Sequence, residues 1–401
     1  MTGMPAIPKN EKAELAEMRH DDRPGRMLYV DNLRIALTAL VIIHHAAVCY
    51  GGTGGWYYLE GRQDAPTVAL LGWLCATNQA FFMSLFFMLS GYFSAASREK
   101  KGARAFLKDR LVRLGIPLLI FDNAVNPILR YWREVKFGGY QGGPGGFIAG
   151  YFRHYEGIGR GPLWFVETLL LFTAAWLAWR ALSGESGSRR DDSGFRLPSR
   201  RSILIFSALM GLIAFAVRLF MRVGHGIGFL NLQVPYCPLY IAFFAIGIRA
   251  RGRDWPALLT AAEGRFWLRL GIVSILLCPV IMIAGGAIGG NADVFLGGPT
   301  WQAMSYALWE PFVCAGMCIG LTALFRERFN SQGAFLARLS RDAYAAYVIH
   351  APVLVFLGYT IRPIEIHPLL KFAGVSALGV AISFAAARLI VFRVPGADRV
   401  F

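Results

Sequence analysis

Residues 33–50 read LRIALTALVIIHHAAVCY, an apolar run that opens with Arg34 and carries two adjacent histidines, His44 and His45. A titratable group in hydrocarbon is costly unless it faces the protein interior or water, so its default interpretation is functional. If the run is a helix, Arg34 and His45 share one face and lie about 16 Å apart along the axis. Asp31 stands one turn below Arg34 on nearly the same stripe. This pattern predicts a helix with a polar stripe, suited to chemistry inside a membrane.

The composition of the whole chain indicates a membrane protein. Of its 401 residues, 55% are hydrophobic and 16% are charged, whereas about a quarter of an ordinary soluble domain is charged. The mean hydropathy is +0.45. Because the apolar residues are gathered in runs, we predict an all-α polytopic membrane bundle of about ten transmembrane helices around a central polar cavity.

The apolar runs give the expected membrane-spanning segments. They are residues 33–50, 67–96, 114–131, 162–182, 203–221, 234–248, 266–289, 300–325, 343–361 and 369–392. The second is long enough to tilt or bend. The sixth is short, and Pro235 and Pro238 stand at its start.

Basic residues are concentrated in alternate connections between these runs. They include Arg98, Lys100, Lys101, Arg104, Lys108, Arg110, Arg113, Arg189, Arg190, Arg196, Arg200, Arg201, Arg251, Arg253, Arg265, Arg326, Arg328 and Arg338. The connection 291–299 has no lysine or arginine. The positive-inside rule therefore places both termini in the cytoplasm. We expect a cytoplasmic tail over residues 1–27, a membrane domain over 28–394 and a second cytoplasmic tail over 395–401.

Several other classes of function are disfavoured. The net charge of +16 does not indicate nucleic-acid binding, because no basic stretch is interleaved with aromatic residues that would stack on bases. The six cysteines lie in or beside apolar runs without the Cys-x-x-Cys spacing of a zinc site. Asp122, Glu167 and Glu310, which lie within the runs, show no metal-ligand spacing either, so we assign no metal.

The connection 132–161 departs from the charge pattern. It contains Arg133, Lys136, Arg153 and Arg160, although it should face outward, and it holds the glycine-rich segment 138–150. Either it is a flexible exterior loop, or it is a lid that admits a bulky acceptor.

Five motifs in order along the chain are similar to those of a known family. They are YVDNLR at 29–34 followed by His45, FFMLSGYF at 86–93, RLVRLGIP at 110–117, LWF at 163–165 and YAAYVIHAP at 344–352. Together they resemble the acyltransferase 3 family of bacterial membrane O-acyltransferases. The opening motif of that family is a basic residue, ten intervening residues and a histidine. The second and third motifs look closest to the glucan biosynthesis protein C branch, which is linked to succinylation of periplasmic glucans.

The resemblance implies a membrane O-acyltransferase in the bacterial inner membrane. It would move a short acyl group, acetyl or succinyl, from a cytoplasmic acyl-CoA to a hydroxyl of a carbohydrate acceptor such as a glucan, an O-antigen or an exopolysaccharide. The acyl-CoA is then the donor substrate, and no bound cofactor is expected. Direct transfer and transfer through an acyl-enzyme both stay open.

The histidines differ in their expected roles. Acyl transfer to a hydroxyl needs a base, and imidazole titrates near the working pH, so we assign His45 as the general base. His44 projects about 100° away from it, and we interpret it as a packing or orienting residue.

Three arginines are expected to bind the acyl donor. Arg34 resembles the essential basic residue of the family, but it lies three turns below His45 and cannot reach the same carbonyl. We expect Arg34 to hold a phosphate or the pantetheine portion of acyl-CoA, oriented by Asp31. Arg110 and Arg113 share a helix face and suit phosphate recognition.

Two further polar residues complete the expected cavity. Glu167 follows the LWF motif and is expected to orient His45. His350 is either a second proton carrier or a helix-packing partner. The competing interpretation is a proton-coupled transporter or exporter in which the same histidines, arginines and carboxylates form a relay.

Overall fold

A computed structural model of the chain describes residues 26–61, 63–155, 157–158, 161–184, 196–227, 229–287 and 290–401. Within these residues the chain is helical, and its only β-pairing consists of isolated bridges. The fold is an all-α helical membrane bundle, as predicted. Most of the expected N-terminal tail lies outside the described residues, as do Arg160, Arg189 and Arg190.

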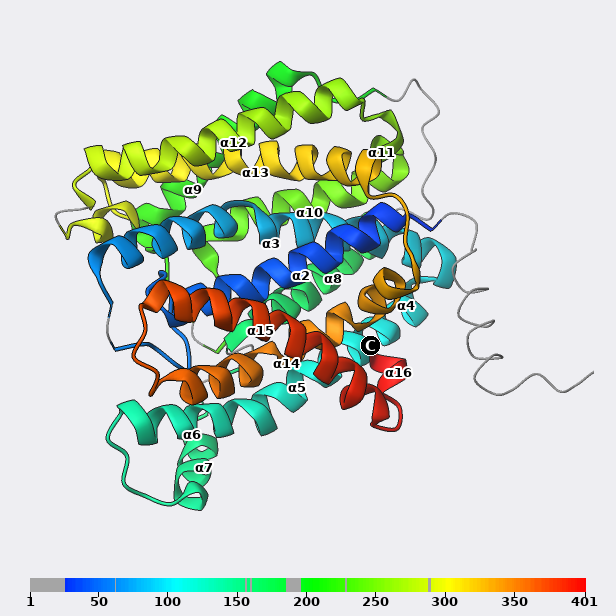
Figure 1. Cartoon of the computed structure of the whole chain (residues 1–401). Coiled ribbons are helices and arrows are strands. Elements are labelled where there is room, and N and C mark those ends of the chain that lie inside the picture. The colour runs from blue at the N-terminus through cyan, green and yellow to red at the C-terminus, as the bar shows by residue number, and fades with distance from the viewer. Residues whose placement is uncertain are drawn as a thin grey trace, which may run out of the picture.

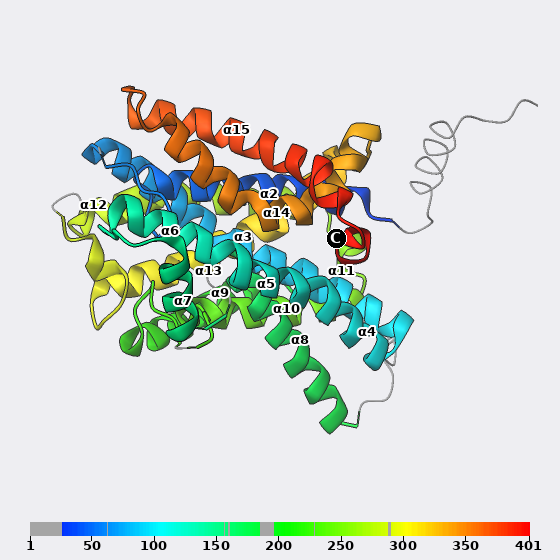
Figure 2. The same ribbon diagram turned by 90° about the horizontal axis from the view of Figure 1, so that it is seen from below.

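The helices follow one another along the chain and gather into one bundle (Figure 1). They are α2 (Leu28–Cys49), α3 (Ala65–Lys101), α4 (Ala103–Arg110), α5 (Ile116–Ile120), α6 (Asn126–Phe137), α7 (Pro144–Arg153), α8 (Trp164–Leu182), α9 (Arg200–Phe220), α10 (Cys237–Gly252), α11 (Trp255–Leu258), α12 (Ala261–Ala284), α13 (Trp301–Arg328), α14 (Ala334–Ile361), α15 (Pro368–Leu389) and α16 (Ala397–Val400). Most of the long helices are roughly parallel or antiparallel, whereas α8 leans away from its neighbours (Figure 2).

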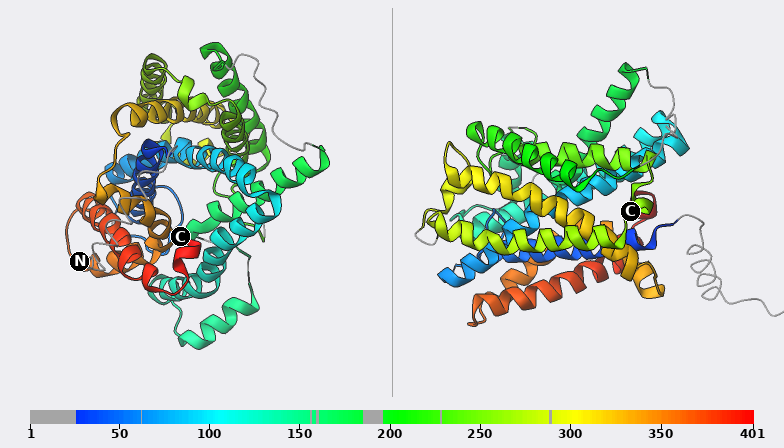
Figure 3. Two further views of the ribbon diagram at one scale, coloured as in Figure 1. Left: turned by 90° about the vertical axis from the view of Figure 1, so that its right-hand side faces the viewer. Right: turned by 90° about the horizontal axis from the view of Figure 1, so that it is seen from above.

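The predicted spans are present as helices. Among the described residues, nine helical segments are long and apolar enough to cross a membrane. The remaining predicted run, 234–248, forms α10, which has 16 residues and packs against α3. We call the end of the bundle where α2 begins and α3 ends the basic end; Figure 3, left, looks onto it. Its residues include Arg34, Arg98, Lys101, Arg110, Arg113, Arg200, Arg249 and Arg326.

Several long helices begin directly after a capping side chain. Asp64 accepts a hydrogen bond from the Thr67 amide at 2.9 Å at the start of α3. Ser199, Thr260 and Thr300 cap α9, α12 and α13 in the same way. These caps satisfy amides that the first helical turn leaves without an intrahelical partner, which fixes where each helix starts.

The third span is one helical segment, residues 103–137. Two of its turns are π-helical, those over Leu111–Gly115 and Phe121–Val125. Proline lacks an amide hydrogen, so Pro117 leaves the carbonyl four residues earlier, that of Arg113, without its helical donor. The Tyr344 hydroxyl donates to that carbonyl at 3.0 Å. The irregular turn is therefore stabilised from α14.

The connection 132–161 contains the helix α7, which packs against α6. The Tyr151 hydroxyl donates to the Asp122 carbonyl at 3.0 Å and accepts from the Asn126 amide at 3.1 Å. The segment following the glycines is thus anchored to the second π-helical turn. Over residues 144–153 the connection is therefore a helix that packs against α6, and not an irregular loop.

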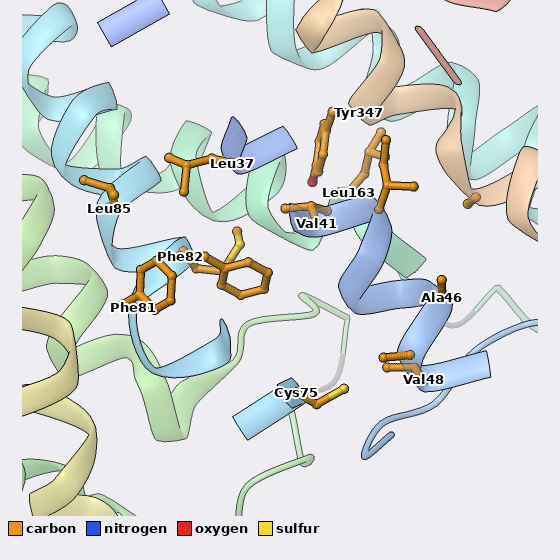
Figure 4. Close-up of a cluster of buried hydrophobic side chains, with 14 of the residues drawn as sticks. Leu37, Val41, Ala46, Val48, Cys75, Phe81, Phe82, Leu85, Leu163 and Tyr347 are labelled. Atoms are coloured by element: carbon orange, nitrogen blue, oxygen red, sulfur yellow. The ribbon is translucent and has the colours of Figure 1, made fainter. Parts of the chain in front are cut away.

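The helix α2 lies inside the bundle and packs against α3, α13, α14 and α15. Its apolar side chains Leu37, Val41 and Ala46 are buried. Figure 4 shows them with Phe82 of α3 and Tyr347 of α14 in one cluster. Because α2 carries both His45 and Arg34, this packing fixes the two ends of the candidate site relative to each other.

The helices α3 and α10 approach each other closely at two glycines. A Cβ on Gly247 would lie 2.0 Å from the Met88 carbonyl oxygen, and one on Gly91 would lie 2.2 Å from the Phe244 carbonyl oxygen. Replacing Gly247 with alanine should therefore lower the free energy of unfolding in detergent by about 3 kcal/mol, because two backbones must separate. Gly252→Ala is the control, since no atom lies within 4 Å of its added Cβ. Equal stability of the two variants in denaturant titrations would contradict this close packing.

Candidate active site

Two histidines from distant parts of the chain meet inside the bundle. The Nδ1 atom of His45, on α2, lies 3.0 Å from the Nε2 atom of His350, on α14. The ring centroids are 4.9 Å apart, with an interplanar angle of 23°. His350 is fully buried, whereas His45 is half-buried. The pair therefore has a protected side and a more open side.

Trp56 covers His45. Its ring stacks on the His45 imidazole at 4.1 Å with an interplanar angle of 17°. The neighbouring Tyr57 is held by its hydroxyl, which donates to Asn126 at 2.8 Å. The loop that follows α2 is thereby tied to the third span, and the orientation of the His45 ring is fixed by packing as well as by hydrogen bonding.

The hydrogen bonds determine which nitrogens carry protons. A carbonyl oxygen only accepts, so Nδ1 of His350 donates to the Tyr347 carbonyl. The Nε2 atom of a neutral His350 then carries a lone pair and accepts from Nδ1–H of His45. This network assigns the tautomers, and it leaves Nε2 of His45 unprotonated and able to take a proton.

His44 faces away from this pair. It is buried, its ring packs on Phe82 of α3 at 5.0 Å, and it meets His45 edge-on at 5.3 Å. Its Nδ1 atom has no hydrogen-bond partner among the described residues. The geometry gives His44 a packing position between α2 and α3.

The three arginines expected to bind a donor line one cavity at the basic end. Arg34, Arg110 and Arg113 surround about 290 Å³ of open space. The deeper wall is apolar and includes Met83, Phe86, Leu89, Phe165 and Leu169. The cavity therefore combines a cationic mouth with an apolar interior.

Local contacts hold these guanidinium groups in place. Asp31 lies between Arg26, at 2.8 Å, and Arg34, at 3.6 Å. Arg110 donates to the Ser94 hydroxyl at 3.1 Å, and Arg113 lies 3.6 Å from Asp109. Because the carboxylate partners are few and shared, the mouth keeps a net positive charge.

Tyr347 connects the cavity to the histidine pair. It lines the cavity, and its ring lies 5.8 Å from the His350 ring. Its hydroxyl donates to the Pro162 carbonyl, and its own carbonyl accepts from His350. Tyr347 therefore contacts both the cationic cavity and the paired imidazoles.

The histidine pair and the three arginines of the cavity fall within one recognised domain. A family model described as an acyltransferase domain matches residues 27–388. The chain belongs to the acyltransferase 3 family. No curated protein and no solved structure matches the chain. This member of the acyltransferase 3 family is therefore a membrane acyltransferase, and all five motifs lie inside the matched region.

Glu167 occupies a different place from the one expected. It is buried, and its Oε2 atom accepts from the Asn231 amide at 3.3 Å. Among the described residues no hydrogen bond joins it to His45, whose partner is His350. The reason is that α14 supplies an imidazole at the position where a carboxylate from α8 was expected.

Two residues of the site were missed from the sequence. Tyr347 lies inside a quoted motif, but only its contacts show that it bridges the cavity and His350. Trp56 follows α2 in a glycine-rich connection, where an isolated aromatic residue was the only signal. Within the described residues no cluster of histidines, cysteines and carboxylates is arranged to hold a metal.

The C-terminal residues are part of this region. The expected tail 395–401 contains α16, and Phe401 packs on Tyr344 at 5.4 Å. Val400 and Phe401 line the mouth of the cationic cavity. This segment is therefore packed against the domain.

Proposed function

We propose that this acyltransferase moves an acetyl or succinyl group from acyl-CoA to a hydroxyl of a carbohydrate acceptor, with His45 as general base. The observation that carries the proposal is the cavity with three arginines whose inner end, at Tyr347, adjoins the His45–His350 pair. The protein would lie in the bacterial inner membrane, with the basic end and both termini in the cytoplasm.

The donor site follows from charge and polarity. Guanidinium groups bind phosphate oxygens through charge-assisted hydrogen bonds, which suits Arg34, Arg110 and Arg113 at the mouth. The apolar wall beyond them suits the pantetheine arm. The thioester would then lie beyond Tyr347, close to the paired histidines.

Acyl transfer from the thioester to the acceptor hydroxyl needs no further reactant. Nε2 of His45 takes the proton of the acceptor hydroxyl as its oxygen attacks the thioester carbonyl. A C–O bond forms, the C–S bond breaks, and the coenzyme A thiolate leaves. The thiolate then receives the proton from His45. His350, which accepts from Nδ1–H of His45, stabilises the imidazolium that forms between these two proton transfers.

The test separates an acyltransferase from a transporter. The purified protein in detergent should release coenzyme A thiol from acetyl-CoA or succinyl-CoA when envelope glycans are supplied. Mass spectrometry of envelope glycans from strains with and without the gene should show an acyl group that depends on the gene. A proton-coupled transporter would need a sealed vesicle and would leave glycan acylation unchanged, and that result would overturn the proposal.

The separate roles of Arg34 in donor binding and His45 in catalysis can be tested directly. Arg34→Lys should raise KM for acyl-CoA about tenfold with a smaller effect on kcat, because lysine keeps the charge but loses the planar fork of donors. Arg104→Lys is the matched control, since Arg104 is exposed and lies outside the cavity. Initial rates over a range of donor concentrations measure both constants. Equal losses of donor affinity and turnover in Arg34→Lys would contradict the assigned role.

A further inference from the structure

A second and larger cavity lies at the basic end, away from the histidine pair. It is enclosed by α9, α10, α12 and α13 and contains about 600 Å³ of open space. Phe206, Ile246, Trp267 and Ile319, one from each helix, form much of its wall. An apolar interior of this size can hold a hydrocarbon chain.

The mouth of this cavity carries an excess of positive charge. Arg200 and Arg249 line it together with one acidic residue, Glu263. Arg200 pairs with Glu263 at 2.9 Å and lies over the Phe266 ring at 4.1 Å. Arg249 is exposed, and no ion pair neutralises it among the described residues. One guanidinium is therefore left for an anion.

Two further groups at the mouth favour an anion. The N-terminus of the 21-residue helix α9 lies there, with Ser199 and Ser202 in the lining. A helix N-terminus attracts negative charge. Trp255 also lines the cavity, and its buried indole N–H has no hydrogen-bond partner among the described residues. Phosphate and ester oxygens are acceptors of the kind that this N–H lacks.

We propose that this cavity binds an acidic phospholipid of the surrounding bilayer, with its phosphate near Arg249 and an acyl chain in the interior. Arg200 begins α9 and Arg249 lies in the last turn of α10, so both stand at the level of the headgroups. Basic pockets between transmembrane helices at the cytoplasmic side bind anionic headgroups. The site is independent of the acyl-transfer reaction.

Lipid retention measured by native mass spectrometry tests the site. The delipidated protein is mixed with equal amounts of phosphatidylglycerol and phosphatidylethanolamine, and retained lipid is counted. Wild type should retain phosphatidylglycerol preferentially, and Arg249→Gln should reduce that retention about fivefold. Arg253→Gln is the control, because it removes the same charge just beyond α10 from a residue outside the cavity lining. It should behave as wild type.

A second pair of variants tests the apolar interior. Ile319→Trp should fill the cavity and reduce retention, whereas Leu276→Trp, on the exposed face of α12, should not. Retained acyl-CoA consumption shows that each variant is folded. The proposal is overturned if both arginine variants lose lipid equally, if neither does, or if the two lipids are retained alike. A repeat of the assay with a polyprenyl phosphate added in equal amount would also overturn the proposal if that lipid were retained in place of phosphatidylglycerol.

Discussion

Replacing His45 with glutamine should lower kcat for acyl transfer by about 10³-fold and leave the affinity for acyl-CoA nearly unchanged. General-base catalysis by a positioned side chain contributes about 10²–10⁴-fold, and the proposed donor contacts are made by arginines at the other end of the cavity. Glutamine keeps much of the volume beneath Trp56 but cannot take a proton at neutral pH. Coenzyme A release gives kcat, and titration calorimetry with acyl-CoA gives the affinity.

His44→Gln is the matched control for this experiment. It removes an imidazole from the adjacent position, where the ring packs on Phe82 and lies outside the hydrogen-bonded pair. Its turnover should stay within a few-fold of wild type. If His44→Gln lowered kcat as much as His45→Gln, the assignment of His45 as the general base would be wrong.

His350 is expected to act through His45 and not on the substrate. His350→Phe keeps an aromatic ring in the stack but removes the Nε2 atom that accepts from His45, so the tautomer of His45 is no longer held. A wrong or mobile tautomer lowers kcat, here by about 10²-fold, without weakening donor binding. His350→Gln offers an amide oxygen to the same Nδ1–H and should recover part of that loss. Equal activity in the two variants would contradict the orienting role.

The positions of the spans could be predicted because hydropathy over about 20 residues is a local property. The helix α2 illustrates this: its apolar run fixed the helix, and its period placed Arg34 and His45 on one face. The three arginines taken from the family motifs line one cavity, and their binding of a donor stays a prediction.

Contacts between distant helices could not be predicted in this way. The His45–His350 bond joins residues 305 positions apart, and no local pattern states which faces of α2 and α14 meet. The π-helical turns depend likewise on Tyr344 and Tyr151, which donate to backbone carbonyls from other helices. Such partners are set by tertiary packing and are visible only in the structure.

The ion pair between Arg218 and Glu310 is the clearest case of a missed partner. Glu310 lies within the run 300–325, and no local pattern indicates that Arg218, within the run 203–221, is its partner. Both side chains are fully buried, and Arg218 donates to Glu310. The guanidinium also lies 5.2 Å from the Tyr236 ring and 5.5 Å from the Tyr306 ring. This cluster joins α9, α13 and the start of α10.

Breaking the Arg218–Glu310 pair should lower the free energy of unfolding more than Gly247→Ala does. Arg218→Met leaves Glu310 as an unpaired buried carboxylate and should lower the free energy of unfolding by about 3–5 kcal/mol, whereas Arg218→Met with Glu310→Leu should recover most of it. Denaturant unfolding in detergent micelles measures both. Arg222→Met is the control, because Arg222 is exposed just beyond the end of α9 and its hydrogen bond is to a backbone carbonyl, that of Asp293, and not to a buried carboxylate. If the single and double variants were equally unstable, packing around Arg218 and not the buried charge would hold α9 to α13.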